Sequence, residues 1–174
     1  EHPRVELHQP GPGVGGHCIP VYPYFLARQF DVDSSLLETA RAVNDSMAAY
    51  TVEKLAAVMS AHGRDLSGST VLLLGVTYKA NVAELRNAPS IPMANELRSG
   101  GGSVVAVDPL VTDWSEFGGV GTAALSDVRE RPVDGVVLLA PHDEFRQLDW
   151  EAFDAPVLDG RDVIDETETN APVY

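Results

Sequence analysis

The sequence predicts an α/β protein in which one long helix precedes a doubly wound, mainly parallel sheet domain. Two patterns support this fold class: a helical periodicity over residues 34–62, and short apolar runs that alternate with helical stretches after residue 67. Strands that alternate with helices are typical of parallel sheets. The hydrophobic content of 44% is ordinary for a globular protein. We therefore divide the chain into residues 1–33, a helical segment 34–66 and a sheet domain 67–174.

The long helix is expected because apolar residues recur at three- and four-residue spacings from Leu36 to Met59. Ser34 or Ser35 is an N-cap candidate, and the pattern ends near His62. About 28 residues at 1.5 Å each give a length of roughly 40 Å, which is more than a small domain needs for its own core. We expect this helix to form the interface of a homodimer. Packing on its own domain is the alternative.

The sheet domain is expected to be Rossmann-like. Its apolar runs are short and continuous, which is typical of parallel strands that are buried on both faces. The predicted strands cover residues 70–76, 103–107, 135–139 and 156–158. A clear helix is predicted over residues 90–98, with weaker ones near residues 113–117 and 143–148.

Ligands of such sheets bind beyond the carboxyl ends of the strands. The loops at that edge, where we expect the site, cover residues 77–86, 108–110, 140–143 and 159–162.

The charge of the chain limits its partners. A net charge of −14, from 26 acidic against 12 basic side chains, disfavours nucleic-acid binding. Lys54 and Lys79 are the only lysines. A surface so acidic resembles those of proteins from salt-loving organisms, in which concentrated cations screen the repulsion. An ordinary acidic cytosolic protein is the alternative.

The sequence also indicates a cytoplasmic protein. No stretch approaches the length needed to cross a bilayer, and residues 1–4 show no leader, so we expect no membrane partner. A single cysteine excludes an internal disulfide and agrees with a reducing compartment.

That cysteine, Cys18, ends a glycine-rich loop with the sequence QPGPGVGGHCIP, residues 9–20. Glycine permits positive φ and close approach to a ligand, and the prolines restrict the flanking dihedrals. The loop formally contains a G-x-G-x-x-G motif, but a dinucleotide fingerprint needs a strand before it and a helix after it. We expect neither, because residues 4–9 are short and polar and Pro20 and Pro23 disfavour a helix. We therefore reject a dinucleotide-binding interpretation of this loop.

A second loop, residues 75–86, carries Lys79 and Arg86. Both lie next to the amino end of the helix predicted from residue 90, where a phosphate or a carboxylate is favoured. This basic pair in so acidic a chain indicates an anion site. The alternative is that both residues cap carbonyls or pair with Glu84.

Three motifs in order, GPGVGGHCIPVYPYFL, VLLLGVTYKANVAELRNAPS and VLDGRDVID, resemble the nucleotide-sugar dehydrogenase family. Its members include UDP-glucose 6-dehydrogenase, GDP-mannose dehydrogenase and UDP-N-acetylmannosamine dehydrogenase. The match covers nearly the whole chain, and the first motif is closest to the UDP-N-acetylhexosamine branch. The resemblance implies oxidation of a sugar C6 alcohol to a carboxylate in two steps, with NAD as cofactor, a UDP-sugar as substrate and a cysteine thioester.

The resemblance also implies roles for single residues. It makes Cys18 the catalytic nucleophile, where a small buried hydrophobe is the alternative. Arg86 would face the cofactor, and Arg161 would bind substrate unless it forms a surface ion pair with Asp159 or Asp162. The other implied substrate-binding residues are Gly13, Gly15, Gly16, Tyr78 and Lys79.

Two departures from the family pattern qualify these expectations. Tyr22 stands where the family usually has an aspartate four residues after the nucleophile. The family's NAD domain, which precedes the cysteine loop, is not in this sequence, so residues 1–33 would end a preceding domain. We expect weak binding of UDP or a UDP-sugar and no dehydrogenase activity from this chain alone.

Two other functions compete with this interpretation. One is a non-catalytic module that binds a nucleotide sugar and dimerises. The other is a metal enzyme that uses His17, Cys18 and His142, but adjacent histidine and cysteine are poor metal-ligand spacing, so we expect no metal. The sequence does not choose among the possible nucleotide sugars.

Overall fold

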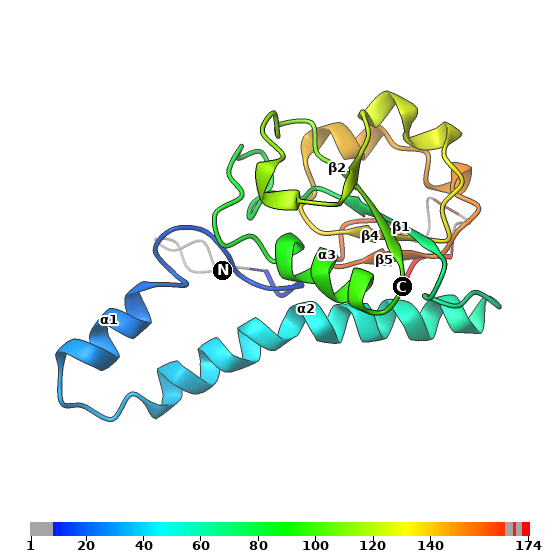
Figure 1. Cartoon of the computed structure of the whole chain (residues 1–174). Coiled ribbons are helices and arrows are strands. Elements are labelled where there is room, and N and C mark those ends of the chain that lie inside the picture. Colours follow the sequence, from blue (N-terminus) through cyan, green and yellow to red (C-terminus); the bar gives the residue numbers. More distant parts are fainter. Residues whose placement is uncertain (1–8, 166–168, 170–171) are drawn as a thin grey trace.

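A computed structural model of the chain describes residues 9–165, 169 and 172–174. Its centre is a parallel five-stranded sheet in the order β3-β2-β1-β4-β5 (Figure 1). This confirms the predicted α/β class with a parallel sheet. The strands are β1 (Thr70–Leu74), β2 (Ser103–Val107), β3 (Gly121–Thr122), β4 (Gly135–Leu138) and β5 (Val157–Asp159).

The central place of β1 in the sheet agrees with its hydrophobicity. β1 has the sequence TVLLL, four of its five residues are buried, and it lies in the middle of the sheet between β2 and β4. A strand that is covered on both faces needs such a continuous apolar run. β3 was not predicted, because its two residues, Gly121 and Thr122, are exposed and provide no apolar signal.

Three α-helices accompany the sheet: α1 (Tyr22–Gln29), α2 (Ser35–Ala61) and α3 (Ser90–Ser99). The expectation that no helix follows the glycine-rich loop is wrong, because α1 begins four residues after Cys18. Pro23 lies in the first turn of α1, where the missing N–H is not needed for a helical hydrogen bond. The residues that would form the preceding strand fall partly in residues 1–8, outside the described residues.

The two weaker helices predicted from sequence are short 3₁₀ turns, η1 (Ser115–Phe117) and η3 (Asp143–Gln147). Two further 3₁₀ segments are η2 (Leu125–Glu130) and η4 (Trp150–Ala152).

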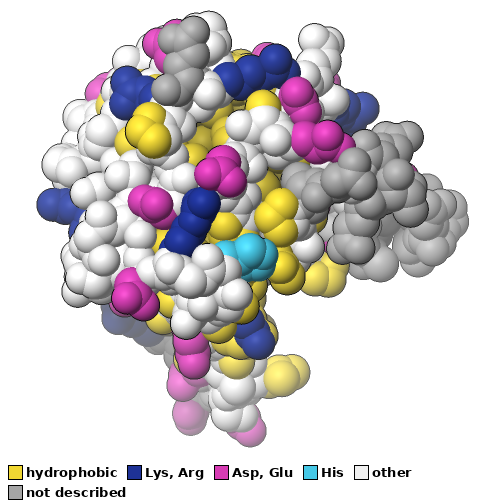
Figure 2. Space-filling view, turned by 90° about the vertical axis from the view of Figure 1, so that its right-hand side faces the viewer, with side chains coloured by type: hydrophobic (Ala, Val, Ile, Leu, Met, Phe, Trp, Pro, Cys, Tyr) yellow, Lys and Arg dark blue, Asp and Glu magenta, His cyan; other side chains and the backbone are white. Residues whose placement is uncertain are grey.

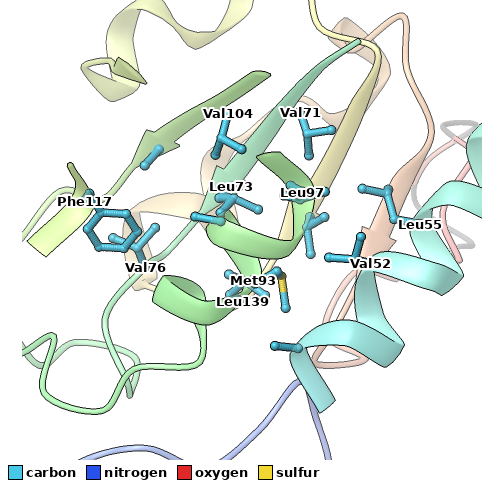
Figure 3. Packing of buried hydrophobic residues seen from close by; sticks show 14 of the residues in the cluster. Val52, Leu55, Val71, Leu73, Val76, Met93, Leu97, Val104, Phe117 and Leu139 are labelled. Atoms are coloured by element: carbon cyan, nitrogen blue, oxygen red, sulfur yellow. The ribbon is translucent and has the colours of Figure 1, made fainter. Parts of the chain in front are cut away.

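The two faces of the sheet are covered differently. On one face α3 and the second half of α2 pack against β1 and β2, with Leu55 and Leu97 fully buried (Figure 3). On the other face η2, η3 and η4 supply the cover, and Phe145 packs there with Leu72 and Leu74, whereas Phe117 of η1 packs on the helical face. One face is thus closed by two helices and the other by irregular chain.

α1 and the first half of α2 project from this sheet domain (Figure 1). We call α1 and residues 35–47 of α2 the helical arm. Every buried residue of α2 lies from Ala48 onward, and α1 has none. Leu36 is 79% exposed and Val43 57%. The second half of α2 therefore packs on its own domain, whereas the arm leaves apolar side chains uncovered.

Acidic and basic side chains are interspersed on the face shown in Figure 2, which carries both kinds between patches of hydrophobic atoms. Among the helices of the described residues, none is both long enough and apolar enough to cross a membrane.

Candidate functional site

The candidate site lies beyond the carboxyl ends of β1, β4 and β5, where the glycine loop, residues 11–16, meets the sheet. A cavity of about 460 Å³ opens there, and we call it the edge cavity. Five of the six predicted substrate-binding residues line it: Gly13, Gly15, Tyr78, Lys79 and Arg161. Gln9, Val14, Ile19, Ala80, Pro141 and Val163 complete its lining. Segments as far apart as Gln9 and Val163 are thus brought together at the edge that the strand pattern indicated.

The glycines are needed where the loop passes close to its neighbours. A Cβ atom on Gly15 would lie 2.3 Å from the carbonyl oxygen of Asn87, too close for any side chain. Gly16 has a φ of 94°, and a Cβ there would lie 2.9 Å from the ring of Tyr78. Gly16, the sixth predicted residue, therefore seats the Tyr78 ring that lines the cavity.

Hydrogen bonds hold the glycine loop from two sides. From α2, the Asn44 side chain accepts from the Val14 N–H at 2.7 Å and donates to the Val14 carbonyl at 3.3 Å. From the loop after β1, the Asn87 amide donates to the Gly16 carbonyl at 2.9 Å. The Gly16 N–H donates to the Arg86 carbonyl, also at 2.9 Å. The path of the loop is therefore fixed by side-chain amides that recognise its backbone.

Sequence reasoning did not identify Asn44 or Asn87. The left-handed φ of Asn87, 53°, belongs to a conformation that asparagine tolerates better than most residues. Asn44 lies in the middle of a helix, where nothing in the sequence pattern distinguishes it.

Lys79 follows β1 on a short segment, residues 76–81, which we call the Lys79 segment. Its side chain is exposed at the cavity and forms no ion pair with any described residue. The expected alternative, pairing with Glu84, applies instead to Arg86, whose Nε lies 3.4 Å from Glu84 Oε1. The charge of Lys79 is therefore available to an anion in the cavity.

A buried hydrogen-bond network underlies the Lys79 segment. Asp108 Oδ2 accepts from the N–H groups of Val76 at 2.8 Å and Thr77 at 3.1 Å, and lies 2.9 Å from His142 Nε2. His142 Nδ1 accepts from the Asn81 N–H at 2.9 Å. Because Nδ1 is an acceptor, the neutral ring carries its proton on Nε2 and donates it to Asp108.

The ionisation of Asp108 reflects this setting. Burial raises the pKa of Asp108, but the hydrogen bond from His142 and the backbone N–H groups of Leu110 and Thr77 outweigh it. The net result is a pKa below the ordinary value of 3.8, so Asp108 is a carboxylate at neutral pH.

Arg161 enters the cavity from the turn after β5. Its Nε donates to the Leu139 carbonyl at 2.6 Å. Burial lowers the pKa of Arg161 while the charge of Asp159 raises it, and an arginine with this shift stays protonated at neutral pH.

The predicted alternative for Arg161, an ion pair with Asp159 or Asp162, is absent among the described residues. The Asp159 carboxylate instead accepts hydrogen bonds within the turn, from the backbone N–H groups of Arg161, Val163 and Ile164.

Cys18 lies outside the edge cavity. It is exposed, so the alternative of a buried hydrophobic cysteine is wrong, and its Sγ lies 3.6 Å from His17 Nδ1. Its carbonyl accepts the N–H groups of Val21 and Tyr22 in the turn that begins α1. Next to this turn is a second cavity of about 450 Å³, the cysteine cavity, lined by His17, Val21, Tyr22, Phe25 and Arg86. Arg86 therefore lies on the cysteine side and not with Lys79.

The three residues weighed as metal ligands do not form a cluster. Both ring nitrogens of His142 are engaged in the buried network, whereas His17 and Cys18 are exposed on the loop. In the described part of the chain, no three histidine, cysteine, aspartate or glutamate side chains gather as a metal site would require.

A parallel sheet with a glycine loop and two cations at its carboxyl edge is an α/β arrangement suited to a phosphorylated ligand. Family comparison makes this specific: the chain belongs to the UDP-glucose/GDP-mannose dehydrogenase family. The UDP binding domain of that family matches residues 72–166, and its central domain matches residues 1–46. The resemblance predicted from the three motifs is thereby confirmed.

The relatives are similar over nearly the whole chain. UDP-N-acetyl-D-mannosamine dehydrogenase of Pyrococcus horikoshii is 31% identical over 170 residues, which cover 95% of this chain and 39% of that protein. NDP-N-acetyl-D-galactosaminuronic acid dehydrogenase of Ralstonia solanacearum is 33% identical over 159 residues, covering 90% and 36%. The solved structure of the Pyrococcus horikoshii enzyme gives a TM-score of 0.83 at 30% identity, covering 99% of this chain and 41% of that one. The chain therefore spans about two fifths of the length of these relatives.

Proposed function

We propose that this chain binds a UDP-sugar in the edge cavity and provides the nucleophile, Cys18, of an NAD-dependent nucleotide-sugar 6-dehydrogenase. The observation that carries the proposal is the joint placement of the glycine loop, Lys79 and Arg161 around one cavity. A diphosphate needs cations and N–H donors, and an arginine fork with a lysine point charge suits it. The names of the relatives support a UDP-N-acetylhexosamine substrate.

In this function each described group has a separate task. The glycine loop and Tyr78 would shape the cavity, while Lys79 and Arg161 would neutralise the diphosphate. The Cys18 thiolate would attack the sugar carbon at the aldehyde level, and after oxidation the carbon would remain on sulfur as a thioester until water releases the carboxylate. Hydrolysis returns the thiol, so Cys18 is regenerated.

NAD, the expected cofactor, would serve as hydride acceptor. The described residues do not build a dinucleotide site, because the loop after β1 lacks glycines two and five residues after Gly75. Arg86 in the cysteine cavity is the group we expect to face the cofactor. We therefore propose that this chain alone releases no NADH from a UDP-sugar and NAD, and its appearance would contradict this part of the proposal.

Nucleotide binding is tested by calorimetry and thermal unfolding with UDP, GDP, UMP and the UDP-sugars. We expect UDP and UDP-sugars to bind and UMP to bind less well, because it lacks the second phosphate. Ligand at a hundred times its Kd stabilises the folded state by about 2.7 kcal/mol. If no diphosphate at millimolar concentration raised the melting temperature or gave a binding signal, the proposal would be contradicted.

A non-catalytic nucleotide-sugar module remains the second candidate, and Tyr22 is the observation that favours it. Its side chain is 57% exposed in the cysteine cavity, where a phenol does not provide a carboxylate at neutral pH. Tyr22→Asp in an enzyme that includes this chain distinguishes the two. Unchanged turnover and thioester accumulation would show that position 22 is immaterial.

We also propose that the protein is a cytoplasmic homodimer that pairs through α2, and that it is adapted to high salt. The uncovered apolar residues of the helical arm and the net charge of −14 support these two proposals. Light scattering in molar potassium chloride should give a dimer mass, and thermal unfolding should shift upward from low to high salt. A monomer would contradict the first proposal, and an unchanged melting temperature the second.

A further inference from the structure

Asp108 and His142 have no task in the chemistry proposed above, although their side chains are fully buried at the edge that carries the cavity. Burial of a carboxylate and an imidazole is unfavourable unless both are well hydrogen-bonded. Here they are bonded to each other and to the backbone. Because burying this pair is unfavourable by itself, its hydrogen-bond partners indicate which part of the chain it stabilises.

Among the described residues, every side-chain hydrogen bond that the pair makes beyond itself, except one from the Leu110 N–H, ends on the Lys79 segment. Asp108 accepts from Val76 and Thr77, and His142 accepts from Asn81. The Thr77 hydroxyl lies 3.0 Å from His142 Nε2 and donates to the Lys79 carbonyl at 3.1 Å. The two buried side chains thus reach the beginning, the middle and the end of the segment.

The segment has few other restraints at its middle. Asn81 has a φ of 61°, so the chain turns back on itself directly after Lys79. Within the turn, the Val82 N–H donates to the Lys79 carbonyl at 3.3 Å, and the Tyr78 N–H donates to the Glu84 carbonyl at 3.1 Å. These local bonds shape the turn. Its distance from Arg161, which also lines the cavity, depends on bonds to other loops: those of the buried pair and one from the Asp143 N–H to Asn81 Oδ1 at 3.1 Å.

That distance depends on the order of the strands. Asp108 follows β2 and His142 follows β4, and these are the two neighbours of β1, which leads into the Lys79 segment. A carboxylate from one side and an imidazole from the other therefore hold the segment in line with its strand.

We propose that Asp108 and His142 are positioning residues, which hold Tyr78 and Lys79 at the spacing from the glycine loop and Arg161 that a nucleoside diphosphate requires. This inference rests on the proposed function for the identity of the ligand. The tests use the whole chain, with UDP as the probe.

Three substitutions isolate the effect. His142→Phe removes both ring nitrogens, and His142→Gln can retain one acceptor and one donor as the conservative replacement. Thr77→Val removes only the hydroxyl that links His142 to the Lys79 carbonyl. Asp134→Asn is the matched control, because Asp134 accepts the Thr70 N–H at 2.8 Å at the opposite end of β1.

We expect His142→Phe to weaken UDP binding about tenfold and Thr77→Val about threefold, whereas His142→Gln recovers most of the affinity. Asp134→Asn should lower the melting temperature and leave the affinity within about twofold. Wild-type affinity in both His142→Phe and Thr77→Val, or an equal loss in Asp134→Asn, would overturn the proposal. If His142→Phe does not fold, Thr77→Val and His142→Gln decide the question.

A second readout needs no nucleotide. Hydrogen exchange of the amides of residues 76–82 should accelerate at least about tenfold in His142→Phe or Thr77→Val, and not in Asp134→Asn. Unchanged exchange there would overturn the positioning role. If wild-type protein did not bind UDP while exchange responded as expected, the proposed function would fail, and only the hold of the buried pair on the Lys79 segment would stand.

Discussion

The edge cavity and the cysteine cavity adjoin the same glycine-rich loop, yet they are built to different degrees. The edge cavity has walls held by hydrogen bonds from Asn44, Asn87 and Arg161. In the cysteine cavity, by contrast, Tyr22 and Phe25 are 57% and 60% exposed. The lining residues there include a cation, Arg86, but no carboxylate.

We infer from this difference that nucleotide binding is the half of the proposed function for which this chain carries the groups. Binding needs a fixed arrangement of donors and cations, and the edge cavity has one. Thioester chemistry needs a nucleophile together with groups that activate water and accept hydride. Of these groups, the described residues around Cys18 provide only the proposed nucleophile, Cys18 itself.

Among the variants of the two cavities, substitution of Arg161 should have the largest effect on UDP binding. Arg161→Met should weaken UDP binding by roughly 10- to 100-fold, because a charged hydrogen bond to phosphate is lost and methionine keeps the apolar stem. Calorimetry measures the change. Arg146→Met is the control, since Arg146 is an exposed cation at the same edge that pairs with Asp143. An equal loss in both variants would mean that general charge, and not the cavity, binds the nucleotide.

Gly15→Ala should have the next largest effect. Its Cβ would lie 2.3 Å from the Asn87 carbonyl oxygen, so the glycine loop must move away from the wall that holds it. We expect about a tenfold loss of UDP affinity and a lower melting temperature. Gly118→Ala is the matched control, because nothing lies within 4 Å of a Cβ at that position. Unaltered affinity in Gly15→Ala would show that the close approach is unimportant for binding.

Acid should loosen the edge cavity through Asp108. Its pKa is below 3.8 in the folded protein, so the carboxylate contributes stability above that pH, and the contribution is lost as the pH falls through the folded value. Urea unfolding between pH 5 and pH 2 should therefore show a declining free energy of unfolding. Asp108→Asn should decline less steeply over the same interval, and parallel curves would contradict the assignment.

The smallest effect is expected at Cys18. Because it is exposed and lies outside the edge cavity, iodoacetamide should modify it in the folded protein, and saturating UDP should change the rate less than about twofold. As the only cysteine, it gives an unambiguous mass-spectrometric signal. Strong protection by UDP would show that the two cavities act as one.

The features that were predictable from sequence are those with a local signal. The apolar runs gave four of the five strands, and the motifs gave the lining of the edge cavity. The prediction of no helix after the glycine-rich loop is wrong at α1, because Pro23 lies in the first turn, where proline does not break a helix. The two-residue strand β3 has no hydrophobic pattern to find.

The pairing of Asp108 with His142 was not predictable for a different reason. Both lie in loops that the strand pattern indicated, but their pairing depends on β2 and β4 flanking β1, which no local pattern encodes. His142 was considered only as a metal ligand. Asn44 likewise became visible only when α2 was placed against the glycine loop.

The contact between Asn44 and Val14 also bears on how this family can vary. Asn44 bonds to the N–H and the carbonyl of Val14 and not to its side chain. Residue 14 can therefore be exchanged for another of suitable size while the loop keeps its course. Residue 44 lacks this freedom, because only a side chain with a donor and an acceptor side by side can replace it. Among related proteins, we therefore expect residue 14 to vary more than residue 44, although the two residues contact each other.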